Sequence, residues 1–390
     1  MKKYLHKHLL VSNCCFICML LSILFLYACA SDKISMVYVG TYTGHGSDGI
    51  YAFRFNPDNG DLRKVGPVAI TDNPSFLNID SAGRILYAVN ELDSFENKSS
   101  GALSVFAINR ETGKLNLLQQ ISSQGAAPAH LSLDKSGRYL MVANYNGGNV
   151  VVFPVNTDGR LGMHTSLIQN SGSSVNPDRQ AGPHAHFIQA TNNNKFVMVA
   201  DLGIDQVLVF RFDAKTGSLT PTDSGIVKLN PGSGPRHIAF SPSGKYIYVL
   251  NELSSTVTSF SHESETGVMK AKQTLSTLPR NFSGKNTAAE ILVDAKGKFL
   301  YVSNRGDNSI GLFTINSIDG KLTPVEWISS GGRIPRNIVI DPTGNWLFAA
   351  NQDSDNIVIF RIDQVTGKLI QTAQTSGIDA PVCIRFTSAK

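Results

Sequence analysis

The sequence predicts an all-β protein, a seven-bladed β-propeller with four-stranded blades. The 390 residues are 42% hydrophobic and 17% charged, which excludes a disordered chain. From Met36 onward, short runs of Val, Ile, Leu, Tyr and Phe alternate with Gly, Asn and Asp turns, and no stretch keeps a helical period. Three kinds of segment then recur about every 50 residues, the spacing expected of propeller blades.

The first recurring segment is an apolar strand that is entered through a proline. Its regular copies begin at Pro74, Pro128, Pro235, Pro335 and Pro381. Two variants complete the set: residues 183–187 carry an extra residue before the strand, and residues 288–291 replace the proline by alanine. We expect this strand to be the innermost of each blade.

The second recurring segment is a tight turn followed by an apolar strand that ends in Asn or Asp. The strand endings are Asn90, Asn144, Asp201, Asn251, Asn304 and Asn351. The turns carry glycine, which adopts positive φ at low cost. Because Asn recurs in almost every copy, we interpret it as a structural residue that bonds the local turn backbone.

The third recurring segment is a polar loop that closes on Gly-x-Leu or a near variant. Its seven copies are centred on Gly60, Gly113, Gly159, Gly217, Gly267, Gly320 and Gly367. The chain begins inside a unit, because residues 36–41 match the second strand, and it ends on a first strand at residues 381–386. The two ends are therefore expected to complete one blade together, which closes the ring and removes exposed strand edges.

The first 28 residues are expected to be an export signal. The stretch from Lys2 to Lys7 is rich in basic residues, residues 9–28 are mostly apolar, and Ala28 precedes Cys29 as in a bacterial lipobox. Cys29 is thus the expected lipidation site of a membrane-anchored lipoprotein that faces the periplasm or the cell exterior. An uncleaved anchor helix and a plain secretory signal are the alternatives, since about 20 apolar residues can span a bilayer.

This reading divides the chain into a signal at 1–28, a short tether at 29–35 and a propeller at 36–390. Cys383 is the only cysteine of the propeller, so no internal disulfide can form there and stability must come from hydrophobic burial. The net charge is +5, to which the signal contributes three lysines. The remaining charge is too small for a nucleic-acid-binding surface.

Chemistry is expected at one mouth of the central channel. The loop entering the first strand of each blade and the loop leaving the second emerge on the same face, because consecutive strands are antiparallel. A side chain that every blade needs should recur, whereas one that is needed once should break the symmetry. The position fourteen residues before the strand-ending Asn breaks it, carrying Phe76, His130, His237, Glu290, Asn337 and Cys383, with His186 assigned to the same row in the variant third unit.

Arg236, Arg305 and Arg336 fall on the same predicted face. Each offers a planar guanidinium that suits a carboxylate or a phosphate, so an anionic ligand is expected. The sequence contains no Gly-x-Ser-x-Gly, Walker, Cys-x-x-Cys or His-Glu-x-x-His motif. We therefore expect neither a serine nucleophile nor a dinucleotide cofactor. The spacing of His130, His186, His237 and Glu290 also matches no recognised metal site, so we predict no metal.

Several stretches resemble the seven-bladed β-propeller lactonase family, which includes propeller-type 6-phosphogluconolactonases and a carboxymuconate cyclase. They are residues 39–43, 144–148, 182–186, 234–237, 289–291, 303–306, 335–337 and 350–353. The resemblance covers nearly all of residues 36–390 and implies a site of His, Arg and Glu on the channel face. Position by position, this site falls on His186, Arg236, Glu290 and Arg336, with Arg305 and His130 as neighbours.

The resemblance implies hydrolysis of a sugar lactone, with 6-phosphogluconolactone as the leading substrate. His186, Glu290 and Arg236 are the expected catalytic residues, and whether His186 or Glu290 acts as base stays open. The expected substrate-binding residues are His130, His184, His237, Arg305 and Arg336. The alternatives are muconate cycloisomerisation and a non-catalytic envelope propeller that binds an anionic sugar or a protein. A closed ring needs no partner subunit, so a monomer is expected.

Overall fold

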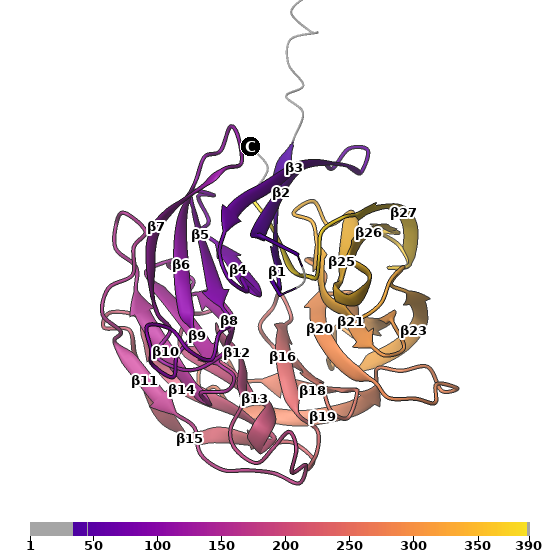
Figure 1. Ribbon diagram of the computed structural model, residues 1–390. Coiled ribbons are helices and arrows are strands. Elements are labelled where there is room, and N and C mark those ends of the chain that lie inside the picture. The colour runs from indigo at the N-terminus through magenta and orange to yellow at the C-terminus, as the bar shows by residue number, and fades with distance from the viewer. Residues whose placement is uncertain (1–33, 45, 388–390) are drawn as a thin grey trace, which may run out of the picture.

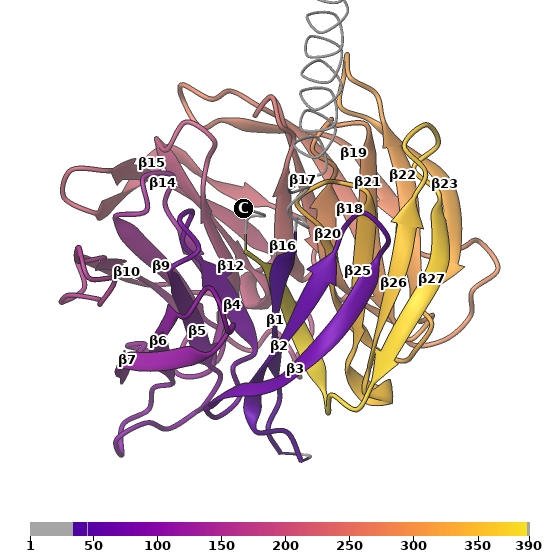
Figure 2. The same ribbon diagram turned by 90° about the horizontal axis from the view of Figure 1, so that it is seen from above.

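The computed structural model describes residues 34–44 and 46–387 and confirms the predicted fold. Its strands form seven four-stranded antiparallel sheets arranged around a central channel (Figure 1; Figure 2). In each sheet, neighbouring strands in the sequence are neighbours in space. The predicted export signal and Cys29 lie outside the described residues. Within the described residues, no helix has the length and apolar character needed to cross a membrane.

The strand bounds are as follows, blade by blade. The blade that joins the two ends of the chain contains β28 (Pro381–Phe386), β1 (Ser35–Thr41), β2 (Gly49–Asn56) and β3 (Asp61–Ile70). The next three contain β4 (Phe76–Ile79), β5 (Ile85–Asn90), β6 (Ala102–Ile108) and β7 (Leu115–Ser122); β8 (Pro128–Leu133), β9 (Tyr139–Asn144), β10 (Asn149–Pro154) and β11 (Ser166–Gln169); and β12 (Ala185–Ala190), β13 (Phe196–Asp201), β14 (Gln206–Asp213) and β15 (Ser218–Lys228). The last three contain β16 (Pro235–Phe240), β17 (Tyr246–Asn251), β18 (Thr256–His262) and β19 (Met269–Ser276); β20 (Thr287–Val293), β21 (Phe299–Arg305), β22 (Ser309–Ile315) and β23 (Leu322–Ser329); and β24 (Pro335–Ile340), β25 (Trp346–Asn351), β26 (Asn356–Ile362) and β27 (Leu369–Ser376). Two three-residue 3₁₀ helices follow β13 and β25, at Leu202–Ile204 and Gln352–Ser354.

The ring closes as the sequence predicts. The last strand, β28, pairs antiparallel with the first, β1, with Val37 opposite Phe386 and Val39 opposite Ile384. The two ends of the chain therefore share one blade, as the indigo and yellow strands beside each other in Figure 1 show. Because β1 runs from Ser35 toward Tyr42, the described chain enters at one end of this blade and reaches the channel mouth at the other.

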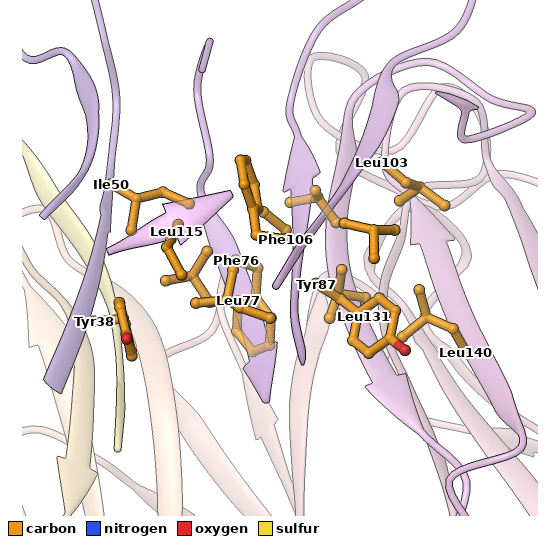
Figure 3. Packing of buried hydrophobic residues seen from close by; sticks show 14 of the residues in the cluster. Tyr38, Ile50, Phe76, Leu77, Tyr87, Leu103, Phe106, Leu115, Leu131 and Leu140 are labelled. Atoms are coloured by element: carbon orange, nitrogen blue, oxygen red, sulfur yellow. The ribbon is translucent and has the colours of Figure 1, made fainter. Parts of the chain in front are cut away.

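The core consists of apolar side chains packed between adjacent blades. One cluster joins three blades through residues such as Tyr38, Leu77, Tyr87 and Leu131, each at most 1% exposed (Figure 3). The second strand of each blade is buried along almost its whole length because neighbouring blades cover both of its faces. Burial of this kind replaces the missing disulfides as the source of stability.

The Gly-x-Leu glycines seal the contact between blades. All seven have positive φ, between 72° and 87°. A Cβ on Gly60 would lie 2.5 Å from the indole of Trp346, which begins the second strand of the adjacent blade. Gly320 meets Tyr246 in the same way at 2.3 Å. The glycine therefore recurs both for its backbone conformation and for the aromatic ring that packs on it.

The strand-ending asparagines are structural, but they bond a different partner from the one we expected. The amide of Asn144 donates to the backbone oxygen of Ser123, and the amide of Asn351 donates to that of Ser330. Each acceptor lies just after the outer strand of the preceding blade, rather than in the local turn. Asn90 and Asn304 make the same kind of bond, so four of these asparagines tie consecutive blades together through a buried amide that satisfies a loop carbonyl. Asn251 differs, because its amide donates to Thr256 and Thr258 of its own blade.

Candidate active site

Two adjoining cavities occupy one mouth of the channel. The larger has a volume of about 310 Å³ and is lined by Tyr42, Glu91, Tyr145, Arg179, His186, Glu252, Thr287, Arg305 and Arg336. The smaller lies deeper, has a volume of about 10 Å³, and is lined by Ser75, Phe76, Ala129, His186, Arg236, His237, Glu290, Arg336, Asn337 and Val382. His186 and Arg336 line both cavities and therefore connect them.

A β-bulge in the innermost strands decides which side chains face the larger cavity. The register shifts between Pro235 and His237 and between Pro335 and Asn337, so that Arg236 and Arg336 are extra residues on their strands. The same shift between Ala185 and Phe187 places His186 in this row. Bulges re-aim side chains next to active sites. The bulge row lies one residue before the symmetry-breaking row that we singled out.

His186 therefore does not share the strand position of His130 and His237, contrary to the prediction from the sequence. Phe187 is the residue that lies fourteen positions before Asp201, and the third unit has no extra residue at this point. The correct row of His186 contains Ser75, Ala129, Arg236, Ala289, Arg336 and Val382. The proline of this unit, Pro183, lies two residues earlier relative to the strand than in the other units, so counting from the proline gives the wrong position for His186.

Glu252 is the central carboxylate of the larger cavity, and the sequence analysis missed it. Its oxygens lie 2.9 Å from Arg179 Nη2, 3.0 Å from Arg236 Nε and 2.8 Å from Arg305 Nη2. Burial alone would raise the pKa of Glu252, but the three guanidiniums outweigh burial and lower it to about 2. Glu252 is therefore ionised at neutral pH and holds three arginines in place.

The residue directly after the strand-ending Asn, or after Thr41 in the closing blade, forms the rim of the larger cavity in several blades. Arg305 occupies this position and was predicted. Tyr42, Glu91, Tyr145 and Glu252 occupy the same position in other blades and were not predicted. The signal was present in the sequence, because each of these residues follows the strand-ending position and no residue type recurs in every blade. Arg179, which comes from the long loop before β12, has no such signal.

Arg336 is the arginine of the larger cavity with the weakest partner in the protein. Its Nη2 lies 3.8 Å from Glu91 Oε2, a long ion pair, and its guanidinium carbon lies 5.1 Å from the centre of the Tyr42 ring. The hydroxyl of Tyr42 donates to Glu91 Oε2 at 2.9 Å. Arg336 thus keeps hydrogen-bond donors that a bound anion can use.

His186 is a neutral base candidate. Burial, with Arg236, His237 and Arg336 nearby, holds its pKa well below the usual 6.5. Its Nδ1 is buried and has no hydrogen-bond partner among the described residues. The ring lies edge-on to Tyr145, with ring centres 5.5 Å apart. The imidazole is therefore unprotonated at neutral pH, which is the state that a general base requires.

Glu290 and His237 lie beneath the larger cavity and do not line it. His237 Nδ1 is 2.6 Å from Glu290 Oε1, and the amide of Asn337 donates to Glu290 Oε2 at 2.6 Å. Burial would raise the pKa of Glu290, but His237, Arg385 and Arg236 lower it below its usual value. Arg236 is also sunk below the rim, 2% exposed, and donates to the backbone oxygen of Ala289.

The structure does not bring His130 or His184 to the larger cavity. His130 packs between Phe76 and Phe187, with ring centres 4.2 and 4.4 Å away, and lines a separate cavity of about 420 Å³ that includes the turn at Asp134. That turn joins the first and second strands and so lies at the other end of the channel. The ring of His184 stacks on that of Tyr145, with ring centres 4.4 Å apart, and its Nδ1 contacts the Tyr145 backbone oxygen. His184 therefore packs against Tyr145, a residue of the rim, and does not line the cavity itself.

The charges of this site suit a small anion. Arg179, Arg305 and Arg336 line the larger cavity, Arg236 lies just below it, and two carboxylates, Glu91 and Glu252, face them. Among the residues that the structure describes, no group of three or more His, Cys, Asp or Glu side chains is placed to hold a metal ion.

A closed seven-bladed ring that holds guanidiniums, carboxylates and a neutral imidazole at one mouth defines a propeller enzyme equipped for ester chemistry. The chain belongs to the lactonase family: the family model described as "Lactonase, 7-bladed beta-propeller" matches residues 36–386. Lactonases are lactone-hydrolysing carboxylic-ester hydrolases, and this confirms the family and the enzyme class that the sequence predicted.

Named relatives are similar over most of the propeller. The 6-phosphogluconolactonase of Bacillus subtilis is 36% identical over 300 residues, which are 77% of this chain and 83% of the relative. The 6-phosphogluconolactonase of Formosa agariphila is 35% identical over 307 residues, covering 77% of this chain and 85% of the relative. The structure of the periplasmic gluconolactonase PpgL from Pseudomonas aeruginosa superposes with a TM-score of 0.85 at 32% identity, over 92% of this chain and all of that one.

Proposed function

We propose that the protein hydrolyses a sugar δ-lactone that carries an anionic group, with 6-phosphogluconolactone as the leading substrate. The observation that carries this proposal is the larger cavity, in which a neutral imidazole faces three guanidiniums. The names of the two relatives as 6-phosphogluconolactonases support the phosphorylated substrate. The name of the Pseudomonas aeruginosa protein supports a gluconolactone in an exported setting.

His186 is the proposed base. It removes a proton from a water molecule, and the resulting hydroxide adds to the lactone carbonyl carbon. The carbonyl oxygen becomes an oxyanion, for which the guanidinium of Arg305 or Arg336 is the available donor. The bond between the carbonyl carbon and the ring oxygen then breaks, and the ring oxygen takes the proton back from His186. The product is the open-chain aldonic acid, and no other reactant is needed.

The geometry favours His186 over Glu290 as the base. Glu290 is 6% exposed, is held by both His237 and Asn337, and does not line the larger cavity. Glu252 lines it, but a carboxylate with a pKa of about 2 that is bound by three arginines is a weak base. His186 alone combines access to the cavity with an unprotonated nitrogen.

Arg336→Gln tests the anionic group of the substrate. Because Arg336 has the loosest ion pair, we assign it to the substrate phosphate, and a lost charged hydrogen bond costs about 1.5–3 kcal/mol. We expect KM for 6-phosphogluconolactone to rise about 10- to 100-fold, with little change for unphosphorylated gluconolactone. Steady-state kinetics on both lactones measure this.

The matched control is Arg333→Gln, an exposed arginine in the loop before β24, whose side chain donates to the Asp353 backbone oxygen and does not line the cavity. It should leave both sets of constants unchanged. An equal loss of kcat on the two lactones in Arg336→Gln would assign Arg336 to the oxyanion instead. Absence of turnover of either lactone by the unaltered chain would reject the proposed function.

We also propose that the protein is an exported lipoprotein whose catalytic mouth faces away from the membrane. The motif Ala28-Cys29 supports lipidation, and β1 starts at Ser35, at the end of its blade opposite Tyr42 and the larger cavity. In cells fed a labelled fatty acid, the wild-type chain should carry the label, and Cys29→Ser should lose it and leave the membrane fraction. Equal labelling of the variant would contradict the assignment of Cys29.

A further inference from the structure

The smaller cavity gathers polar atoms that have no partner. Ser75 Oγ, His186 Nδ1, Arg236 Nε and His237 Nε2 are all buried and make no hydrogen bond among the described residues. Arg236 Nε lies 3.0 Å from Glu252 Oε2 but without the alignment of a hydrogen bond. The residues of all four atoms line the same cavity of about 10 Å³. That volume suffices for one water molecule, which needs two to four polar partners.

The hydrogen bonds of Glu290 decide which nitrogen of His237 carries the proton. Glu290 is ionised and can only accept, so His237 Nδ1 must donate to it. In the neutral imidazole this leaves Nε2 as an acceptor. Glu290 is itself held by the amide of Asn337, whose oxygen accepts from the backbone nitrogen of Ile384 at 2.9 Å. The tautomer of His237 is therefore determined by three linked groups.

A single water satisfies the set, whereas an anion does not. The water donates one proton to His237 Nε2 and the other to Ser75 Oγ, and it accepts from Arg236 Nε and from His186 Nδ1. An anion such as chloride would face the lone pair of His237 Nε2, which repels it. With Nδ1 of His186 protonated and directed at the water, Nε2 is the nitrogen left for the larger cavity, which His186 also lines.

We propose that the smaller cavity holds one resident water, and that this water links Glu290 and His237 to His186 so that Glu290 acts as a positioning residue for the base. This inference rests on the proposed function of His186. The chain of contacts runs from the Glu290 carboxylate to His237, from His237 to the water, and from the water to His186 Nδ1. The rings of His237 and His186 are neighbours, with centres 5.2 Å apart, and both line the smaller cavity. When His186 takes a proton, the buried carboxylate stabilises the resulting charge through the link.

The arginines around these two histidines lower their pKa values, whereas Glu290 raises the pKa of His237. Arg236 and Arg336 lower the proton affinity of His186, and Arg236 and Arg385 lower that of His237. His130 also lies against His237, at 5.3 Å between ring centres. Glu290 acts against these arginines, because its carboxylate raises the pKa of His237. Its loss should therefore weaken the base.

The first test uses the unaltered full chain and does not depend on activity. A high-resolution crystal structure should show one water within hydrogen-bond distance of His186 Nδ1 and His237 Nε2. Nitrogen-15 spectra of the histidine rings should show Nδ1 protonated in both residues. A dry cavity, a chloride ion in it, or His186 protonated at Nε2 would each overturn the proposal.

The second test is Glu290→Gln, with Glu326→Gln as the matched control. We expect kcat for the lactone to fall about 10-fold with KM unchanged, as for a base that has lost its orienting group. The acid limb of the kcat/KM profile should move to lower pH, because His186 loses proton affinity. Glu326 is in the same blade, pairs with Lys368 on the surface, and should show neither effect.

The two tests separate the water link from the proposed function. If the wild-type chain turns over no lactone, the proposed function fails, yet the crystal structure and the spectra still decide whether the link exists. If the chain is active but Glu290→Gln keeps the wild-type kcat and pH profile, the positioning role of Glu290 is wrong. If Glu290→Gln does not fold, the wild-type measurements alone decide.

Discussion

Replacing His186 by asparagine should lower kcat for the lactone by about 10²- to 10⁴-fold, the range that a positioned general base contributes. Among the residues that the structure describes, His186 is the only histidine that lines the larger cavity, and its depressed pKa keeps it unprotonated at neutral pH. Asparagine retains a polar side chain of similar length but cannot take the proton. Initial rates at saturating lactone measure the effect, and circular dichroism checks that the propeller remains folded.

The control for this variant is His164→Asn. His164 lies in the loop between β10 and β11, packs beside Phe153 and lines neither cavity of the site. Its replacement should leave kcat and KM as in the wild type. Wild-type turnover in His186→Asn would contradict the assignment of the base, and Glu252, the carboxylate nearest the arginines, would become the next candidate.

Replacing Glu252 by glutamine should cost about 3–5 kcal/mol of unfolding free energy, the usual effect of removing one partner from a buried ion pair. Glu252 is 4% exposed and is the shared counter-charge of Arg179, Arg236 and Arg305. Without it, three guanidiniums repel one another in a buried site. Urea unfolding followed by fluorescence measures the loss, and lactone turnover should fall with it because the arginines lose their positions.

The same carboxylate predicts how stability depends on pH. The pKa of Glu252 falls from 4.5 to about 2 on folding, so its stabilising contribution is fully present above pH 4.5 and is lost as the pH falls toward 2. The unfolding free energy of Glu252→Gln should therefore decline less over this interval than that of the wild type. The control is Glu265→Gln. This variant removes an ion pair with Lys195 at the surface and should lower the unfolding free energy by at most about 1 kcal/mol. Equal stability of the two variants would show that the arginines do not depend on Glu252.

The fold could be predicted because each blade repeats the same physical requirements. A glycine with positive φ must lie under the aromatic or aliphatic side chain of the adjacent blade, and seven sequence copies of it identify seven blades. A second constraint acts in the hairpin between the first and second strands, where Asn194 takes φ of 60° at the position that carries glycine in the other hairpins. Such local constraints are visible in sequence because they act within one or two neighbouring units.

The site could be predicted only in part. Arg305, Arg336 and His186 reach the larger cavity as expected, whereas Glu290, His237 and Arg236 lie below it. Glu290 and His237 differ from His186 and Arg336 by a bulge of one residue, which turns adjacent side chains to opposite sides of the strand. Arg236 shares the bulge position with Arg336 but is turned toward Glu252 and the Ala289 backbone. A bulge has no marker in this sequence, so the two rows of residues could not be separated before the structure was known.

The sequence by itself thus determined the seven blades, their closure through the two ends of the chain, and the arginine-rich character of one channel mouth. These properties depend on repetition and on residue type. Only the tertiary structure decided that Glu252 holds the arginines, that His186 rather than Glu290 lines the larger cavity, and that His130 belongs to the other end of the channel. Those assignments depend on which atoms of distant blades come within a few ångströms, and that distance is set by strand register and packing.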